Sequence, residues 1–453
     1  MPIEILETTQ PDFAERFARL REPRPDAESR REKQVRAILE AVRAEGDRAL
    51  LRFAEEFDGT RLAPERLRVS VEELREAERQ LSPKERAALK LAARRITGFH
   101  RKQFEQQRHK TWSVRDPAGL VLGEIVSPLR RVGVYVPGGQ ACYPSTALMN
   151  AIPARVAGVR EIVLVTPPRK EGDHPAVLAA ARLAGVTEVY RVGGAQAIAA
   201  LAYGTETIRR VDKIVGPGNA WVQTAKRLVY GTVDIDKPAG PSEILVVADR
   251  RAPASFVAAD LLAQAEHGSG DECAILLSPS RPLVEAVREE IRRQLPLLPR
   301  RKEIATVLRR RSALVVVRSL EEALSLAEEV SPEHLELLVE KPERLLPRLR
   351  NAGAIFLGPF SPAPLGDYLA GPNHVLPTGG AARFASPLGV SDFVKRTNLV
   401  AASAGGLAKL GPAVVTLAEL ESYAAHAGAI RSRLDSWNER NGKSARRAGK
   451  TKA

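Results

Sequence analysis

Hydrophobic positions along this chain follow one period before about residue 132 and a different one after it. In the first region Val35, Ile38, Leu39 and Val42 have the i, i+3, i+4, i+7 spacing of an amphipathic helix. The next helix is closed by the turn signal Asp58-Gly59. The first third of the chain is therefore predicted to be helical.

A second long helical stretch is predicted from about Val71 to Phe104. Ser82-Pro83 interrupts it in the manner of a cap residue followed by a proline in the first turn of a new helix. We therefore expect two consecutive helices over this stretch.

After residue 132, short apolar runs rich in β-branched residues alternate with alanine-rich helical stretches. This alternation predicts parallel βαβ units, and runs that are apolar at every position predict strands covered on both faces. The expected strands are residues 132–136, 162–165, 189–192, 213–215, 244–247, 274–277, 314–317 and 354–357. A loop-rich segment from 361 to 387 and a helical segment to about 438 follow. The predicted class is α/β, doubly wound, with two sheet domains.

Glycine-rich turns come directly after several predicted strands, at Pro137-Gly138-Gly139, Gly193-Gly194 and Gly216-Pro217-Gly218. Ligands of open α/β sheets bind at the carboxyl ends of strands, where bare backbone N–H groups can approach a phosphate. Neither a GxGxxG fingerprint nor a GxxxxGK[ST] loop is present. The turns are therefore compatible with a dinucleotide site and equally with simple chain reversal.

Length and composition narrow the class of protein. A chain of 453 residues fits two or three domains, and its 44% hydrophobic content is that of a globular protein. Cys142 and Cys273 cannot build a disulfide framework, which favours a reducing compartment. No signal-peptide pattern and no apolar run of bilayer length is found. We expect a cytoplasmic protein with no membrane partner.

The formal net charge of +14 raises the question of nucleic-acid binding. Residues 439–453 hold six basic side chains against one acid, and elsewhere Arg and Glu alternate as on a solvated helix face. No nucleic-acid-binding motif accompanies the charge. We therefore expect no nucleic-acid partner and a disordered tail over 439–453. The rival hypothesis, polyanion binding by this tail, predicts strong salt dependence.

Four side chains suggest a metal site. Gln264 and His267 are spaced i, i+3, Asp367 lies in a loop, and His426 lies near the chain end. Two imidazoles, a carboxylate and an amide oxygen are donors that zinc accepts, and the absence of a thiolate suggests a working metal. The alternative is that each histidine is a cap or a packed polar residue. From the residues alone, caps or packed polar residues are the favoured interpretation.

Glu333-His334 is a second candidate, because an adjacent carboxylate and imidazole can transfer protons near neutral pH. The pair follows Ser331-Pro332, a helix-start signal, and a glutamate in the first turn is also favoured by the helix dipole. From spacing alone, the ordinary helix N-terminus is the favoured interpretation.

Several motifs, in order and at matching spacing, resemble the histidinol dehydrogenase family over nearly the whole chain except the basic tail. They are Val42-Arg-Ala-Glu-Gly-Asp47, Tyr135-Val-Pro-Gly-Gly139, Tyr143-Pro-Ser145, Gly193-Gly-Ala-Gln-Ala-Ile-Ala-Ala200, Val211-Asp-Lys-Ile-Val-Gly-Pro-Gly-Asn219, Ala239-Gly-Pro-Ser-Glu243, Gln264-Ala-Glu-His267, Ser331-Pro-Glu-His334, Gly366-Asp-Tyr368, Gly371-Pro-Asn-His-Val-Leu-Pro377 and the pair Glu421 and His426. The resemblance implies oxidation of L-histidinol to L-histidine through an aldehyde, with two NAD⁺ used in succession and one zinc ion per subunit.

The resemblance also implies roles for individual residues. The zinc ligands would be Gln264, His267, Asp367 and His426, and the proton-transfer residues Glu333 and His334. Ser242, His374 and Glu421 would hold the substrate, together with the zinc ligands and the proton-transfer pair. NAD⁺ would contact Tyr135, Gln196 and Asn219. The alternative is a paralogous NAD-dependent dehydrogenase that oxidises another small alcohol to its acid. The retained His374 and Glu421 argue against it.

For the fold, the resemblance implies two incomplete Rossmann-like domains, one inserted in the other, and a homodimer in which the C-terminal segment completes the partner's site. The expected limits are an N-terminal arm (1–26), a first α/β domain with the zinc and catalytic residues (27–133 and 242–388), an inserted domain with the NAD contacts (134–241), a dimerisation segment (389–438) and the basic tail (439–453).

Overall fold

The computed structural model describes residues 3–20, 25–107, 109–138, 142–238, 240–267 and 270–449, with the side chains of 25–28 and 441–449 left out. The chain divides into two compact units, a first unit of residues 1–107 and 129–393 and a second unit of residues 108–128 and 394–453. Two parallel sheets covered by helices make up the first unit, which confirms the predicted α/β class.

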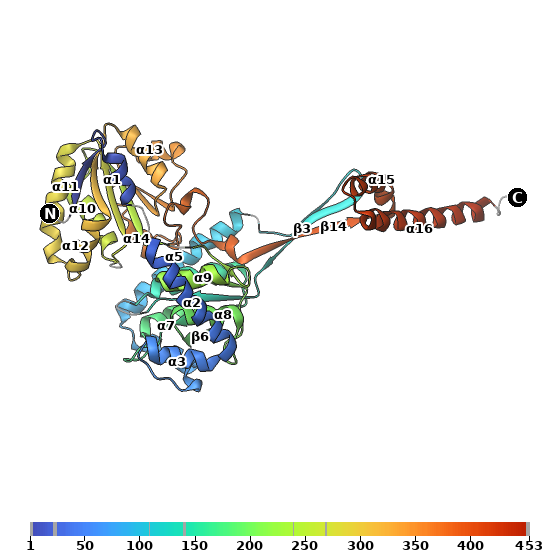
Figure 1. The fold of residues 1–453 in the computed structure, drawn as a ribbon, viewed down its shortest axis with the longest axis horizontal. Helices are drawn as coiled ribbons and strands as arrows, with labels where there is room; N and C mark the ends of the chain where they lie inside the picture. The colour runs from blue at the N-terminus through green and yellow to red at the C-terminus, as the bar shows by residue number, and fades with distance from the viewer. Residues whose placement is uncertain are drawn as a thin grey trace. The chain divides into compact units, whose positions relative to one another are not determined.

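A six-stranded parallel sheet, which we call sheet A, has the strand order β1-β11-β10-β9-β12-β13. Its strands are β1 (Glu4–Glu7), β9 (Glu243–Ala248), β10 (Cys273–Ser278), β11 (Ser312–Val316), β12 (His334–Leu338) and β13 (Ala354–Leu357). One face packs against α10 (Ala254–Ala265), α11 (Arg281–Gln294) and α12 (Arg301–Arg310), and the other against α1 (Phe13–Arg19) and α13 (Leu320–Val330) (Figure 1). The short helix α14 (Ala363–Tyr368) follows β13.

A five-stranded parallel sheet, which we call sheet B, has the order β6-β5-β4-β7-β8. Its strands are β4 (Arg131–Tyr135), β5 (Glu161–Thr166), β6 (Glu188–Arg191), β7 (Lys213–Val215) and β8 (Asp234–Ile235). One face is covered by α2 (Pro25–Glu45), α3 (Asp47–Phe57), α8 (Gly194–Tyr203) and α9 (Ala220–Val229). The other is covered by α6 (Pro144–Ala157), which packs with α7 (Pro175–Ala184) and α5 (Pro83–Gln106), and α4 (Val71–Gln80) packs with α7.

Most elements predicted from the sequence are present. All eight expected strands form, and Ser70 and Ser82 begin α4 and α5 with capping boxes, in which the serine and the glutamate three residues later satisfy each other's backbone N–H groups. Val35 and Val42 are buried, as the helical spacing predicts. However, α2 and α3 pack on sheet B, although the predicted domain limits grouped them with residues 242–388.

The favoured interpretation of Glu333-His334 as a helix start is wrong, because residues 334–338 form strand β12 between β9 and β13. Leu335 and Leu337 are fully buried on one face of sheet A, and Leu338 is buried on the other. This two-sided burial outweighs the local Ser-Pro cap signal. The preceding helix α13 ends instead at Ser331, which adopts a left-handed conformation with φ 52°.

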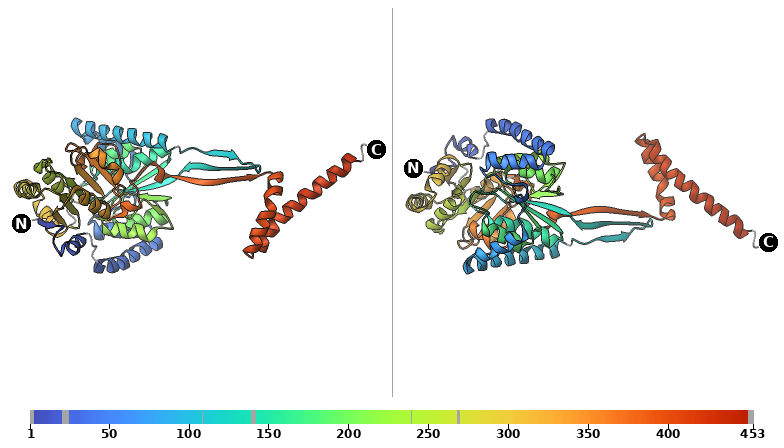
Figure 2. Two further views of the ribbon diagram at one scale, coloured as in Figure 1. Left: turned by 90° about the horizontal axis from the view of Figure 1, so that it is seen from above. Right: turned by 90° about the horizontal axis from the view of Figure 1, so that it is seen from below.

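The second unit contains an antiparallel sheet and two helices (Figure 2). The sheet consists of β2 (Trp112–Arg115), β3 (Leu120–Pro128) and β14 (Val394–Ala402), and β14 was not expected from the sequence. The helices are α15 (Ala404–Leu420) and α16 (Ala424–Gly449). Helix α16 continues into the basic tail as far as Gly449; residues 450–453 lie outside the described residues.

Five short 3₁₀ segments complete the described chain: Pro64–Arg66, Leu295–Leu297, Pro342–Arg348, Ala381–Arg383 and Val390–Phe393. Across the described ranges, none of the helices combines the length and hydropathy that a membrane span requires.

Candidate active site

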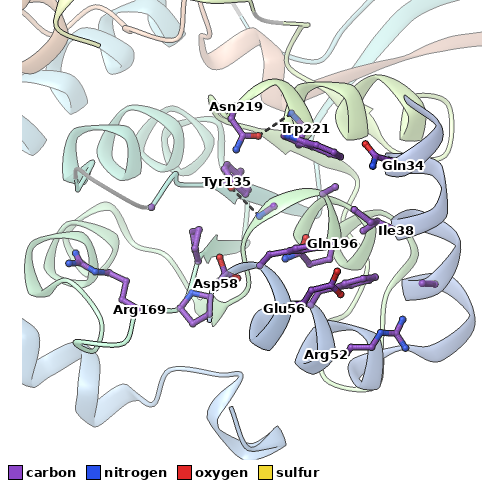
Figure 3. Close-up of a pocket in the computed structure, with 18 of the residues that line it drawn as sticks. Gln34, Ile38, Arg52, Glu56, Asp58, Tyr135, Arg169, Gln196, Asn219 and Trp221 are labelled. Carbon is purple, nitrogen blue, oxygen red and sulfur yellow. Dashed lines mark hydrogen bonds between the residues drawn. The ribbon is translucent and has the colours of Figure 1, made fainter. Parts of the chain in front are cut away.

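A cavity of about 1050 Å³ opens at the carboxyl ends of the strands of sheet B (Figure 3). Three predicted cofactor contacts line it together. Tyr135 ends β4, Gln196 lies in the first turn of α8, and Asn219 caps α9. A cavity of this size accommodates a large cofactor or ligand.

The backbone around this cavity is held by specific contacts. The hydroxyl of Tyr135 accepts a hydrogen bond from Gly194 N at 3.2 Å, and burial raises the pKa of Tyr135 to about 12, so the phenol stays neutral. Asn219 Oδ1 accepts from Trp221 N at 3.0 Å and from Val222 N at 3.1 Å. These bonds fix two of the three predicted contacts.

The turn before Asn219 is clamped by a buried ion pair between Lys226 and Asp236. Lys226 Nζ donates to Gly216 O at 2.8 Å, and Gly216 N donates to Asp236 Oδ2 at 2.9 Å. Gly216 has φ 116°, and a Cβ atom there would lie 2.2 Å from Tyr135 O, so only glycine fits. The Gly216-Pro217-Gly218 motif predicts this turn, but no sequence pattern indicates the role of Lys226 or Asp236.

Further lining residues, which the sequence did not predict, come from α2, from α3 and from the residue after α3; among them are Gln34, Arg52 and Asp58 (Figure 3). Asp58 Oδ2 is buried without a hydrogen-bond partner, and burial raises the pKa of Asp58 to about 6. Its sequence signal, Asp-Gly after a helix, was interpreted only as a turn.

The predicted proton-transfer pair lies in sheet A, at the amino ends of β9 and β12 rather than at carboxyl ends. Glu333 and His334 are each only 5% exposed. The backbone of Glu243 holds both: its N–H donates to Glu333 Oε2 at 2.9 Å, and its carbonyl accepts from His334 Nδ1 at 3.0 Å. Because a carbonyl can only accept, the proton of a neutral His334 resides on Nδ1 and Nε2 carries the free lone pair.

Charges nearby set the proton affinity of this pair. Burial opposes a charge on His334, but the carboxylates of Glu333 and Asp367 outweigh it and raise the pKa of His334 to about 9. Burial raises the pKa of Glu333 to about 7. His334 Nε2 lies 3.7 Å from Asp367 Oδ1 and is buried without a hydrogen-bond partner. A cation bound by Asp367 would partly neutralise that carboxylate. The pKa of His334 would then fall, which favours the neutral imidazole that can act as a base.

Three of the four predicted zinc ligands lie in the first unit. Gln264 is in the last turn of α10, His267 follows the end of that helix, and Asp367 is in α14. His267 Nδ1 donates to Gln264 O at 3.1 Å, which leaves Nε2 available as a ligand. The proximity of His334, and to a lesser extent of His374 and His267, outweighs burial and lowers the pKa of Asp367.

These residues fit a zinc ion in their chemistry. The side-chain amide of Gln264 is buried and its Nε2 has no partner; a half-turn of the amide presents Oε1 at the same position. Among the described residues, no three His, Cys, Asp or Glu side chains are grouped to hold a metal. The proposed set includes an amide, and its fourth member, His426, belongs to the second unit.

The remaining predicted substrate contacts fall in both units. Ser242 directly precedes β9, and His374 Nδ1 donates to Asp367 O at 3.0 Å, so its Nε2 is available to a ligand. Burial lowers the pKa of His374 and keeps it neutral. Glu421 ends α15, and His426 lies in the first turn of α16 with its ring 5.0 Å from that of Tyr423. Both are exposed in the second unit.

Comparisons with known proteins point to one family. The family model described as histidinol dehydrogenase matches residues 21–434. A histidinol dehydrogenase of Aquifex aeolicus is 49% identical over 435 residues, 96% of this chain and 99% of that protein. One of Syntrophotalea carbinolica is 51% identical over 405 residues, 89% and 92% of the two chains. A crystal structure of histidinol dehydrogenase from Elizabethkingia anophelis is similar with TM-score 0.88 and 36% identity, covering 96% and 99%.

Proposed function

The chain belongs to the histidinol dehydrogenase family, and from this premise we propose that it oxidises L-histidinol to L-histidine through histidinal with two NAD⁺. The observation that carries the proposal is the buried pair Glu333 and His334, whose acceptor atoms are oriented by the backbone of Glu243. His334 Nε2 faces Asp367, beside His267 and His374.

His334 Nε2 is the atom suited to take the hydroxyl proton while hydride leaves the carbinol carbon for NAD⁺. The second oxidation requires water to add to the aldehyde. Glu333, with a pKa near 7 because of burial, is suited to remove the proton from that water before a second hydride leaves. We propose that His374, through its available Nε2, and Ser242, which directly precedes β9, also bind the substrate.

We propose that Gln264, His267, Asp367 and the His426 of a second copy hold one zinc ion per subunit. When bound, the zinc supplies a positive centre that orients the amine and imidazole of the substrate. Tyr135, Gln196 and Asn219 would contact NAD⁺ in the cavity of sheet B.

We also propose a homodimer in which residues 389–438 of one copy, including Glu421 and His426, complete the site of the other. Apolar side chains exposed on the second unit support this: Val400 is 68% exposed, Leu417 60% and Leu420 76%. Large apolar side chains grouped on one small unit are typical of a surface that another chain covers.

The test is a product count with purified protein, zinc, NAD⁺ and L-histidinol. Two NADH per histidinol consumed are expected. One NADH per histidinol would eliminate the second oxidation and the role given to Glu333. No NADH would refute the substrate assignment and favour the paralogous dehydrogenase.

A further inference from the structure

A carboxyl group lies inside the apolar layer between sheet A and α10. Glu336 is fully buried in β12, two residues after His334 and therefore on the same face of the strand. Its neighbours across the sheet are Val246 of β9 and Phe356 of β13. A glutamate in such surroundings requires partners, because an isolated buried carboxylate is costly.

Glu336 has one partner on each of two neighbouring elements. Oε1 accepts a hydrogen bond from Ala363 N at 2.7 Å, at the start of α14. On the other side the carboxyl group of Asp260, on α10, is in hydrogen-bonding contact with Glu336. Oε2 of Glu336 has no donor in the described part of the chain.

Two carboxylates in contact cannot both remain ionised away from water, because both are acceptors and both are negative. Burial and the charge of Asp260 raise the pKa of Glu336, and burial raises that of Asp260. Three groups face the carboxyl group of Glu336: the carboxyl group of Asp260 from α10, Ala363 N from α14 and the imidazole of His334 from β12. A proton between the two carboxyl groups supplies the missing donor.

We propose that Asp260 and Glu336 share one proton and that this bridge positions the three elements that carry Gln264, His334 and Asp367. The spacing supports the proposal: Asp260 lies one helical turn before Gln264 on α10, and Ala363 lies one turn before Asp367 on α14. Glu336 and Asp260 are positioning residues, since they act through the elements that they join. This inference rests on the proposed function, because that function identifies Gln264, His334 and Asp367 as parts of one active site.

Two substitutions of Glu336 distinguish the effect of its hydrogen bonds from the effect of its volume in the core. Glu336→Gln keeps an acceptor for Ala363 N and supplies an N–H donor to Asp260, so it mimics the protonated glutamate. Glu336→Met keeps the volume but removes both bonds. Glu340→Gln is the control, because Glu340 lies near the end of the same strand, is exposed and pairs with Arg251.

The measurements are zinc affinity by chelator competition, kcat, and the melting temperature without zinc. We expect Glu336→Gln and Glu340→Gln to behave like the wild type. Glu336→Met is expected to lose roughly 10- to 100-fold in zinc affinity or kcat, the usual effect of removing a group that orients metal ligands. Equal behaviour of the Met and Gln variants, or equal damage by both, would overturn the proposal.

Infrared difference spectroscopy tests the shared proton even if Glu336→Met does not fold. In the difference spectrum at neutral pH, the wild type should show one C=O stretch of a protonated carboxyl that Glu336→Gln lacks, whatever Glu333 contributes to both proteins. Its persistence in Glu336→Gln would overturn the proposal. This readout needs neither substrate nor zinc, so it stands if the proposed dehydrogenase activity fails.

Discussion

The two parallel sheets of the first unit carry their candidate chemistry at opposite ends of their strands. In sheet B, Tyr135, Gln196 and Asn219 lie at carboxyl ends, around one cavity. In sheet A, Ser242, Glu333 and His334 lie at the amino ends of β9 and β12. The rule for ligand sites in open α/β sheets finds the first region and would miss the second.

The two regions also differ in how they are held. Backbone turns shape the cavity of sheet B. These turns are held by the neutral hydroxyl of Tyr135 and by the buried ion pair between Lys226 and Asp236. The cluster of sheet A consists of titratable side chains whose proton positions depend on the carbonyl of Glu243 and on each other. The first arrangement suits binding and the second suits proton transfer. Substitutions should therefore separate cofactor binding from turnover.

The largest expected effect is that of His334→Asn, which removes the proton acceptor. The value of kcat should fall by about 10²- to 10⁴-fold, the usual contribution of a general base. Zinc content and NAD⁺ affinity should be unchanged, because neither the predicted ligands nor the cavity of sheet B include this side chain. Metal analysis and NAD⁺ titration check this, and loss of zinc would show that the division of roles is wrong.

A smaller effect, confined to the other region, is expected from Lys226→Met. It leaves Asp236 buried without its partner, which should cost about 3–5 kcal/mol of the free energy of unfolding. It also releases Gly216, so KM for NAD⁺ should rise while zinc per chain stays constant. The neighbouring Arg227→Met is the control, since its ion pair with Glu32 is largely exposed and contributes little. An unchanged KM would refute the clamp.

The smallest expected effect is that of Asp58→Asn, and it depends on pH. The pKa of Asp58 is about 6 in the folded protein, above its ordinary value of 3.8. Between these two pH values the folded protein therefore keeps a proton on Asp58 that the unfolded chain has lost. This group therefore makes stability fall as pH rises from about 4 to 6 in the wild type, a contribution that the variant lacks. At neutral pH the variant should be more stable by about 1–2 kcal/mol, allowing for the partial exposure of this group.

Denaturant melts of both proteins at acidic and neutral pH measure this difference. At pH below about 4 the two proteins should have nearly equal stability, because Asp58 is protonated in both the folded and unfolded wild type. A gap of the same size at every pH would show that burial of the charge is not its cause.

The buried strands were predictable because runs such as 244–247 and 274–277 are apolar at every position and are covered on both faces. Strand β12 was not, because a local Ser-Pro signal suggested a helix and the burial of Leu335 and Leu337 depends on strands distant in sequence. Strand β14 was missed since seven of its nine side chains are exposed, which leaves little hydrophobic pattern.

The candidate site divides in a similar way. Residue types and motif spacing pointed to Gln264, His267, Asp367 and the pair Glu333 and His334 through the family resemblance. Glu336 and Asp260 had one available signal, a charged residue within an apolar strand, but their contact joins residues 76 positions apart in the chain. The tautomer of His334 depends on a backbone carbonyl, which no side-chain pattern encodes.

The most direct test of the central claim, that the cluster of sheet A is completed by the second unit of another copy, is complementation between two inactive variants. His334→Asn and His426→Ala are each expected to be inactive. Unfolding, mixing and refolding them together should restore roughly a quarter of the wild-type activity, because half of the dimers would be mixed and each would hold one intact site. No recovery, with mixed dimers demonstrated, would contradict the claim.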